Sequence, residues 1–239
     1  MNSFFEVLMS TVSTENPIWA NLLSYWRLDE TTGTSVEDIK GGKTGTASNL
    51  VGWVSGKNNN AASFNATTSK ISLANNTIYP FERTDSFSTS CWIKRSGSKT
   101  GEQMIFTKIH EGGIYNGIQF CFNMNRLMLY LITSYPTMIN VNTNNTFTGS
   151  TNFYHIVMTY NGSSNASGVK IYVDGVSQTL TVVTNNLNGS ILSDGTFTLG
   201  NRLSSNGLSG VLDEFGLWNT VLTQSQVTEL YNSGNGLFY

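Results

Sequence analysis

Charged side chains are scarce in this sequence. They make up 12% of its 239 residues, about half the share of roughly 25% that is usual for soluble domains. Asn, Ser, Thr and Gly fill the segments between apolar runs instead. The 13 Lys and Arg residues are balanced by 15 Asp and Glu, and no basic run occurs. The electrostatic attraction that drives non-specific nucleic-acid binding is therefore missing, and we expect no nucleic-acid partner.

Long apolar runs are missing too. No segment approaches the roughly 20 apolar residues that a membrane-spanning helix needs. Even the apolar run at residues 127–132 is short and is followed by polar residues. Residues 1–14 contain several apolar side chains, but they lack a basic region and include Glu6. This composition argues against a signal peptide. We expect no membrane insertion and no export signal.

Cysteine is rare as well. Only Cys91 and Cys121 are present, and both fall in segments predicted to be strands, where a buried thiol is more common than a functional one. The two cysteines therefore do not identify a redox compartment.

The C-terminal 30 residues carry the clearest local pattern. Residues 211–218 alternate with a period of two, as in a β-strand. Thr223 and Gln226 then have the spacing of a capping box, and Leu222 before the cap can pack onto Val227. We predict a short helix with Val227, Leu230 and Tyr231 on one face, ended by Gly234 in the left-handed region.

Hairpins and short strands fill the rest of the chain. Asp174-Gly175 separates residues 170–173 from 176–178, and a two-residue Asp-Gly connection favours a type I′ turn. A second hairpin is predicted from the alternating residues 118–122 and 127–131. Further strands are expected at residues 22–28, 70–73, 87–94, 103–108, 153–160 and 196–200. Many short strands with Gly and Asn turns, and one clear helix, indicate a sandwich.

Several segments resemble the laminin-G-like, concanavalin A-like lectin domains. Residues 24–30 (SYWRLDE), before an acidic and glycine-rich loop, are similar to the opening of that family, and the C-terminal strand, helix and glycine-rich exit are similar to its closing segment. Residues 61–65 (AASFN), 87–93 (FSTSCWI) and 169–175 (VKIYVDG) look like its interior landmarks, in order. The resemblance covers residues 21–239 and implies an all-β, antiparallel two-sheet jelly-roll sandwich with one short C-terminal helix.

Residues 1–20 lie outside the resemblance and are predicted to be an N-terminal arm before a single domain at residues 21–239. The chain is broken at Pro17, and Trp19 follows. Either this segment packs on its own domain as an edge strand or short helix, or it docks on other virion proteins or on copies of the same chain.

Catalysis is not expected. Glucanases related to this family carry paired acids in an E-x-D-x-x-E pattern, so that one carboxylate attacks while another donates a proton, and no such run occurs here. Asp213 and Glu214 are adjacent and are predicted to point to opposite sides of a strand. His110 and His155 have no neighbouring nucleophile-and-base motif. We expect a protein that is not an enzyme.

The resemblance implies a possible calcium site. Members of the superfamily often hold Ca²⁺ where a loop near the front of the domain meets the final strand, and Asp38 and Asp213 match these positions. Calcium takes about six to eight oxygen ligands and tolerates irregular geometry, so a glycine-rich loop suits it. Lys40 and Lys43, two basic residues close to this loop, count against calcium binding there. The alternative is that Asp38 caps a turn and Asp213 accepts hydrogen bonds from the facing loop.

The resemblance also implies a glycan site, built from aromatic faces and a few placed polar groups. The ligand-binding candidates on predicted loops are Trp53, Tyr115, Asn116, Tyr135 and Arg202. The alternative is that each of them anchors a loop or packs against the domain. Trp26, Trp92 and Trp218 fall inside strand patterns and are predicted to be buried.

These expectations combine into one functional prediction. A lectin-like sandwich with a short arm and no export signal suits a phage tail, fibre or capsid-decoration protein, located in the virion and binding a cell-surface glycan without catalysis. Two alternatives stay open: a secreted, extracellular carbohydrate-binding or adhesion module, and a purely structural jelly roll without a ligand.

Overall fold

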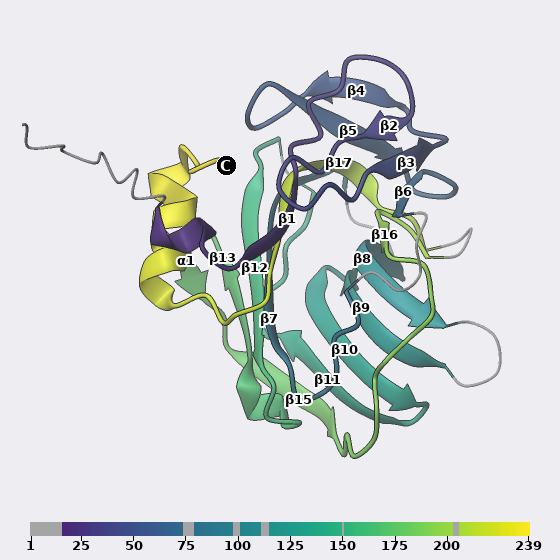
Figure 1. The fold of residues 1–239 in the computed structure, drawn as a ribbon, viewed down its shortest axis with the longest axis vertical. Coiled ribbons are helices and arrows are strands. Elements are labelled where there is room, and N and C mark those ends of the chain that lie inside the picture. Colours follow the sequence, from purple (N-terminus) through teal and green to yellow (C-terminus); the bar gives the residue numbers. More distant parts are fainter. Residues whose placement is uncertain (1–15, 74–78, 98–100, 111–114, 150, 203–205) are drawn as a thin grey trace, which may run out of the picture.

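The structure is a computed structural model that describes residues 16–73, 79–97, 101–110, 115–149, 151–202 and 206–239. It contains two antiparallel β-sheets packed face to face, with one short helix near the C-terminus (Figure 1). The predicted all-β jelly-roll sandwich is confirmed.

The first sheet runs in the order β14-β13-β12-β7-β17-β5-β4, and β1 also pairs with β17. Its strands are β1 (Leu22–Trp26), β4 (Gly52–Ser55), β5 (Asn60–Asn65), β7 (Ser86–Arg95), β12 (Tyr154–Asn161), β13 (Val169–Val173), β14 (Val176–Ser177) and β17 (Ser209–Trp218).

The second sheet runs in the order β15-β11-β10-β9-β8-β16-β6-β3-β2. Its strands are β2 (Ser35–Val36), β3 (Gly45–Ser48), β6 (Lys70–Leu73), β8 (Glu102–His110), β9 (Asn116–Asn123), β10 (Arg126–Ser134), β11 (Thr137–Thr143), β15 (Leu180–Asn185) and β16 (Thr198–Leu199). The helical elements are η1 (Pro17–Trp19), η2 (Ala166–Gly168), α1 (Gln224–Tyr231) and η3 (Asn232–Gly234).

The main core fills the space between the sheets. Alternate residues of each strand point into it, because successive side chains of a strand face opposite sides; Phe120, Leu129 and Leu131 are examples from β9 and β10. Trp26 is fully buried in this core, as predicted. Trp218 is also fully buried, but in a second apolar cluster.

Both predicted hairpins are present. Asp174 and Gly175 join β13 to β14 with φ of 51° and 78°, which is the pair of positive φ angles that a type I′ turn requires. Met124 and Asn125 join β9 to β10 with φ of 47° and 65°. These turns fix the register of the two strand pairs.

Helix α1 begins as predicted and ends earlier than predicted. Thr223 Oγ1 accepts from the backbone N–H of Gln226 at 3.3 Å, and Gln226 Oε1 accepts from the N–H of Thr223 at 2.9 Å. The first residue in the left-handed region is Asn232, with φ 47°, and Gly234 follows at φ 88°. Asparagine tolerates this region better than most residues, so it replaces glycine as the helix stop.

Residues 16–20 pack on the domain rather than extending from it. Ile18 and Trp19 of η1 are buried in the second apolar cluster with Trp218. Trp19 stacks on Trp218 with ring centroids 6.1 Å apart, and Trp218 Nε1 donates to the carbonyl of Ile18 at 2.8 Å. Of the two interpretations of the N-terminal segment, self-packing holds for these residues; residues 1–15 lie outside the described part of the chain.

The two cysteines are buried free thiols, in agreement with the sequence expectation. Burial raises the pKa of both Cys91 and Cys121 well above the usual range. In the described residues, no helix has the length and apolar character needed to cross a membrane.

Candidate functional site

The outer face of the second sheet carries the side chains that leave the core. Phe120 and Leu131 point inward, so their chain neighbours Gln119, Tyr130 and Ile132 point outward. Gln119 of β9 lies opposite Tyr130 of β10, and Ile132 lies opposite Met138 of β11. The strand register therefore assembles polar, aromatic and apolar side chains on one surface.

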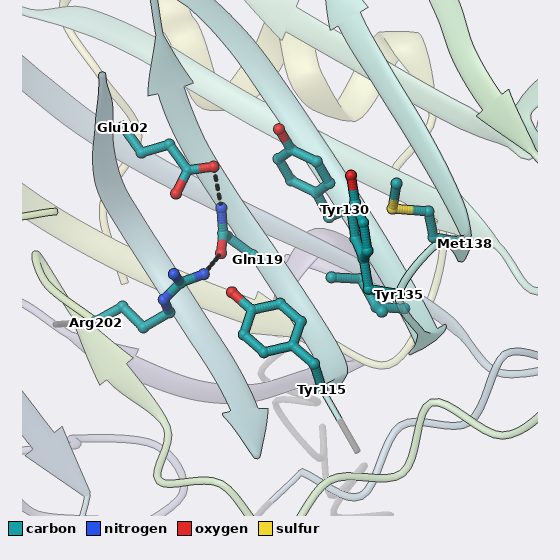
Figure 2. A pocket seen from close by; sticks show the side chains of 8 residues that line it. Glu102, Tyr115, Gln119, Tyr130, Tyr135, Met138 and Arg202 are labelled. Carbon is teal, nitrogen blue, oxygen red and sulfur yellow. Dashed lines mark hydrogen bonds between the residues drawn. The ribbon is translucent and has the colours of Figure 1, made fainter. Parts of the chain in front are cut away.

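These side chains line a pocket of about 410 Å³, which we call the aromatic pocket (Figure 2). Its walls also take residues from outside the strands: Tyr135 lies in the turn between β10 and β11, Tyr115 precedes β9, and Arg202 follows β16. In the described part of the chain, the lining consists of Glu102, Tyr115, Gln119, Tyr130, Ile132, Tyr135, Met138 and Arg202. Three tyrosines thus surround one cavity, and Tyr135 is 73% exposed at its rim.

A hydrogen-bonded chain of three polar side chains crosses this pocket. Gln119 Nε2 donates to Glu102 Oε1 at 3.0 Å, and Arg202 Nη1 donates to Gln119 Oε1. The Arg202 guanidinium also lies over the ring of Tyr115, 5.1 Å from its centroid. Glu102 and Arg202 have opposite charges, so the pocket as a whole is close to neutral. The network holds each polar group in a fixed orientation.

Tyr130 adds a neutral hydroxyl to the same surface. Burial, reinforced by nearby Cys121 and Glu102, raises the pKa of Tyr130 well above its usual range. Its phenol therefore stays protonated at physiological pH and can both donate and accept a hydrogen bond.

The structure brings together three of the five residues predicted to bind a ligand. Tyr115, Tyr135 and Arg202 all line the aromatic pocket. Trp53 lies on β4, at the far end of the molecule from β9–β11 in Figure 1, where its Nε1 donates to the carbonyl of Gly33 at 3.3 Å. Asn116 donates from Nδ2 to the carbonyl of Leu192 and so anchors a loop. Trp53 and Asn116 therefore contact their own domain, as in the alternative that each candidate anchors a loop or packs against the domain.

The polar members Glu102 and Gln119 and the aromatic Tyr130 were not predicted from the sequence. Gln119 and Tyr130 lie between the alternating apolar residues from which the second hairpin was predicted. That alternation was the signal that could have identified them.

Asp38 caps a turn. Its two carboxylate oxygens accept hydrogen bonds from Ser24 Oγ and from the backbone N–H groups of Tyr25, Lys40, Gly41 and Lys43. A carboxylate offers about four lone-pair positions, so these donors occupy the side chain.

Asp213 and Glu214 differ from the sequence expectation. They were predicted to point to opposite sides of β17, but both reach the same loop: Asp213 Oδ2 accepts from the N–H groups of Lys57 and Asn58 at 2.7 and 3.1 Å, and Glu214 Oε1 accepts from Asn58 Nδ2 at 2.9 Å. The cause is a register shift between Asp213 and Gly216, with Glu214 at φ 51°, because a bulge redirects a side chain.

Burial leaves these two carboxyl groups partly uncompensated. Asp213 is 0% and Glu214 2% exposed, and Asp213 Oδ1 and Glu214 Oε2 make no hydrogen bond within the described part of the chain. Loss of solvation raises the pKa of Asp213 to about 8 and that of Glu214 to about 7. Two unpartnered carboxyl oxygens would suit a cation, although the described residues contain no group of three or more His, Cys, Asp or Glu side chains that could hold a metal.

A different pocket, of about 490 Å³, lies on the outer face of the first sheet between Trp92 and Tyr231. Trp92 is 4% exposed. Lys57 Nζ lies 4.8 Å from the centroid of its ring, and Tyr231 stacks on that ring at 6.0 Å. Protein side chains already engage this indole, so it offers no open stacking surface, unlike the 73% exposed Tyr135 of the aromatic pocket.

The sequence matches a known family over most of its length. The profile of the Concanavalin A-like lectin/glucanases superfamily matches residues 45–228. No curated protein is similar enough in sequence to count as a match.

Solved structures with the same fold come from several kinds of protein. The binding domain of Paraclostridial Mosquitocidal Protein 1 superposes with a TM-score of 0.71 at 18% identity, covering 91% of this chain and 53% of that one. Domain 4 of AbnA, a GH43 extracellular arabinanase from Geobacillus stearothermophilus in complex with arabinotriose, gives 0.63 at 19% identity, covering 87% and 97%. Trypanosoma rangeli sialidase gives 0.65 at 17% identity, covering 90% and 33%. This chain thus spans about half of the mosquitocidal binding domain and a third of the sialidase.

Proposed function

Because this chain belongs to the Concanavalin A-like lectin/glucanases superfamily, we propose that it is a non-catalytic carbohydrate-binding domain whose aromatic pocket takes a sugar residue of a cell-surface glycan. The observation that carries the proposal is the pocket itself, where three tyrosines surround the chain of hydrogen bonds from Glu102 through Gln119 to Arg202.

The pocket matches the chemistry of a sugar ring. A sugar has an apolar C–H face and a rim of hydroxyl groups, so it needs an aromatic surface beside fixed donors and acceptors. Tyr135 at the rim supplies an exposed ring, and Gln119 and Arg202 supply oriented polar atoms. These groups are already held in place by their mutual hydrogen bonds, which lowers the entropic cost of binding.

The similar structures support the proposal at the level of the fold. Domain 4 of the arabinanase was solved with arabinotriose, and the mosquitocidal protein contributes a domain described as a binding domain. Those properties belong to those proteins, and at their low identity only the fold is shared with this chain.

The absence of catalysis is part of the proposal. Glycoside hydrolysis in most families needs two carboxyl groups facing the scissile bond, and among the residues that the structure describes, Glu102 is the one carboxyl group in the lining of the aromatic pocket. Asp213 and Glu214 have exposed fractions of 0% and 2%, so a substrate cannot reach them.

The proposal is tested by replacing Tyr135, whose exposed side chain does not support the core. We expect the parent to bind oligosaccharides on a glycan array, and Tyr135→Ala to weaken the affinity for each bound glycan roughly tenfold or more, as for an aromatic hot spot. Titration calorimetry with a bound glycan gives the affinity. Met124→Ala is the matched control, since Met124 is also 73% exposed, at the opposite turn of β10.

Two results would contradict the proposal. A parent protein that binds no glycan on the array removes the carbohydrate function. Glycan binding that Tyr135→Ala leaves unchanged removes the aromatic pocket as its site.

A structural calcium ion is a second, separate proposal. Its support is the pair of unpartnered, buried oxygens of Asp213 and Glu214, which a cation would compensate. Asp38 is left out of the proposed site because its oxygens already accept hydrogen bonds. We expect calcium to raise the thermal unfolding temperature of the parent and chelator to lower it, because a ligand of the folded state stabilises it. Asp213→Asn should lose this response and Asp38→Asn should keep it. A parent insensitive to both calcium and chelator rejects the ion.

The virion location stays a prediction from the sequence, with the extracellular adhesion module as its alternative. Genes for capsid, portal or tail proteins beside this one would support the virion, whereas a glycosidase or surface-anchor gene would support the module. In either setting the aromatic pocket has the same proposed role.

A further inference from the structure

A second cavity, of about 570 Å³, adjoins the aromatic pocket on the outer face of the second sheet. We call it the polar pocket. Arg202 lines both cavities. Its walls also include Lys70 and Ser72 of β6, Thr107 and His110 of β8, Thr198 of β16, and Asp194.

The register of the sheet places the two cavities in one row. Thr198 lies opposite Thr107, Thr107 opposite Gln119, and Gln119 opposite Tyr130. Three strand spacings separate Thr198 from Tyr130, which is about 14 Å. This row is longer than one sugar ring, so a ligand that fills it is an oligosaccharide.

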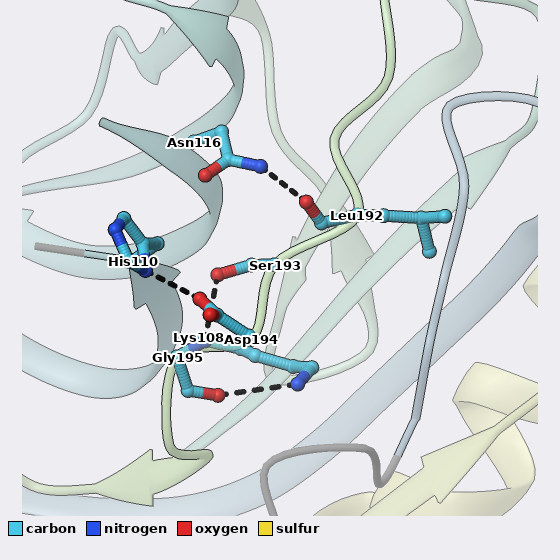
Figure 3. A network of polar contacts seen from close by, with 7 residues as sticks. All are labelled: Lys108, His110, Asn116, Leu192, Ser193, Asp194 and Gly195. Carbon is cyan, nitrogen blue, oxygen red and sulfur yellow. Dashed lines mark hydrogen bonds and ion pairs between the residues drawn. The ribbon is translucent and has the colours of Figure 1, made fainter. Parts of the chain in front are cut away.

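The polar pocket has cationic side chains on its walls. Lys70 is half-buried, and its ammonium group has no ion-pair or hydrogen-bond partner among the residues that the structure describes. Asp194, the carboxylate in the lining, is held by His110 Nδ1 (Figure 3). Lys108 Nζ lies close by and donates to the carbonyl of Gly195 at 3.1 Å. The ammonium group of Lys70, which is paired with no carboxylate among the described residues, therefore lines a cavity that Arg202 also borders.

The hydroxyl groups of the lining differ in whether they already make a hydrogen bond within the protein. Thr107 Oγ1 donates to the carbonyl of Ile118 at 3.3 Å, and Thr198 Oγ1 donates to that of Asn201 at 2.7 Å. Ser72 Oγ is buried and makes no hydrogen bond within the described residues. A buried polar group without a partner is unfavourable, and an anion bound by Lys70 would provide the missing acceptor.

We infer that the two pockets are neighbouring subsites for one oligosaccharide, and that the polar pocket takes a negatively charged sugar residue, with a carboxylate or a sulfate ester, held between Lys70 and Arg202. This inference rests on the proposed carbohydrate binding and specifies its ligand class. The neutral aromatic pocket holds the adjoining uncharged residue, so the acidic group determines specificity.

The test is a glycan array of matched pairs. Each neutral oligosaccharide is printed beside the same chain extended by sialic acid and beside the same chain carrying a sulfate ester, so that the arms separate the two sources of negative charge. We expect the parent to prefer one acidic form over its neutral partner by roughly tenfold, the effect of one charge-assisted hydrogen bond. The preference should weaken at high salt, since part of it is a screened attraction.

Variants of Lys70 assign the preference to the polar pocket. Lys70→Gln should bring the acidic form to the affinity of the neutral one and leave neutral binding unchanged, whereas Lys70→Arg should keep the preference because it keeps the charge. Lys170→Gln is the matched control, because Lys170 is an exposed lysine on β13 of the other sheet. Equal thermal unfolding temperatures show that each variant is folded.

The outcomes separate this inference from the function on which it depends. Equal binding of neutral and acidic partners, or an acidic preference that survives Lys70→Gln, overturns the inference and leaves the neutral aromatic site standing. A parent that binds no glycan overturns both.

Discussion

Asp213 and Glu214 place two neighbouring carboxyl groups in the interior, on a bulge of β17. Their folded-state pKa values, about 8 and about 7, lie above the values of 3.8 and 4.5 expected for solvated groups. Between about pH 4 and pH 8 the folded chain therefore binds more protons at these residues than the unfolded chain does. Their contribution to stability accordingly falls as the pH rises through that range.

Glu214→Gln should remove one of these two contributions. Glutamine keeps an oxygen for the Asn58 amide and carries no charge at any pH. We expect the free energy of unfolding of the variant to rise above that of the parent between about pH 4.5 and pH 7, by a few kcal/mol at the upper end, since each pKa unit corresponds to about 1.4 kcal/mol. Urea unfolding in the presence of chelator, at several pH values, measures the difference.

Glu37→Gln serves as the control for this pH dependence, because Glu37 is an exposed carboxyl group. It should follow the parent at every pH. A constant difference between Glu214→Gln and the parent across the range would contradict the raised pKa of Glu214.

Single residues also show how far the sequence could predict the aromatic pocket. Tyr115, Tyr135 and Arg202 were predicted because aromatic and polar side chains on loops are candidates for sugar contacts. Gln119 and Tyr130 were not, because alternation along a strand can place a residue on the outer face but does not show which residue of the next strand lies beside it. That register is a tertiary property, and only the structure pairs them.

At the scale of elements, the sequence predicted best where local chemistry determines geometry. Asp174-Gly175 specifies its own turn, and Thr223 with Gln226 specifies the helix start. Six strands were not predicted, namely β2, β3, β4, β5, β11 and β15. Of these, β11 alternates with asparagines, and β15 is an edge strand that is largely exposed. Ile139 and Val141 of β11 alternate with two asparagines, so a period-two signal was present and was missed, whereas β15 has no clear alternation. In the sheet, β11 pairs with β10, and β15 pairs with β11.

The bulge in β17 is the element that most affected the interpretation of function. Strict alternation along residues 211–218 predicts that Asp213 and Glu214 separate, and one register shift brings them to the same loop. A bulge in the middle of a strand leaves little trace in a single sequence. The buried acid pair was therefore visible only in the structure.

In the whole molecule, the outer faces of the two sheets have different coverings. Helix α1 and residues 16–20 pack at the outer face of the first sheet, where they bury Trp218 and Val157 in the second apolar cluster (Figure 1). The outer face of the second sheet carries the aromatic and polar pockets. One face of the sandwich is thus used for stability, and the other is proposed to bind the ligand.

Residues 16–20 should therefore contribute to the stability of the domain although they precede its first strand. Removing residues 1–20 takes away Ile18 and Trp19 and leaves Trp218 without the carbonyl that its Nε1 contacts. We expect the chain that starts at residue 21 to be less stable than the chain that starts at residue 16 by about 3–5 kcal/mol, the usual cost of losing a buried tryptophan. Urea unfolding of the two truncated chains isolates these five residues, and Trp19→Ala in the full chain should reproduce most of the loss. Equal stability of the two truncated chains would mean that the second apolar cluster does not depend on η1, and that the domain begins at residue 21.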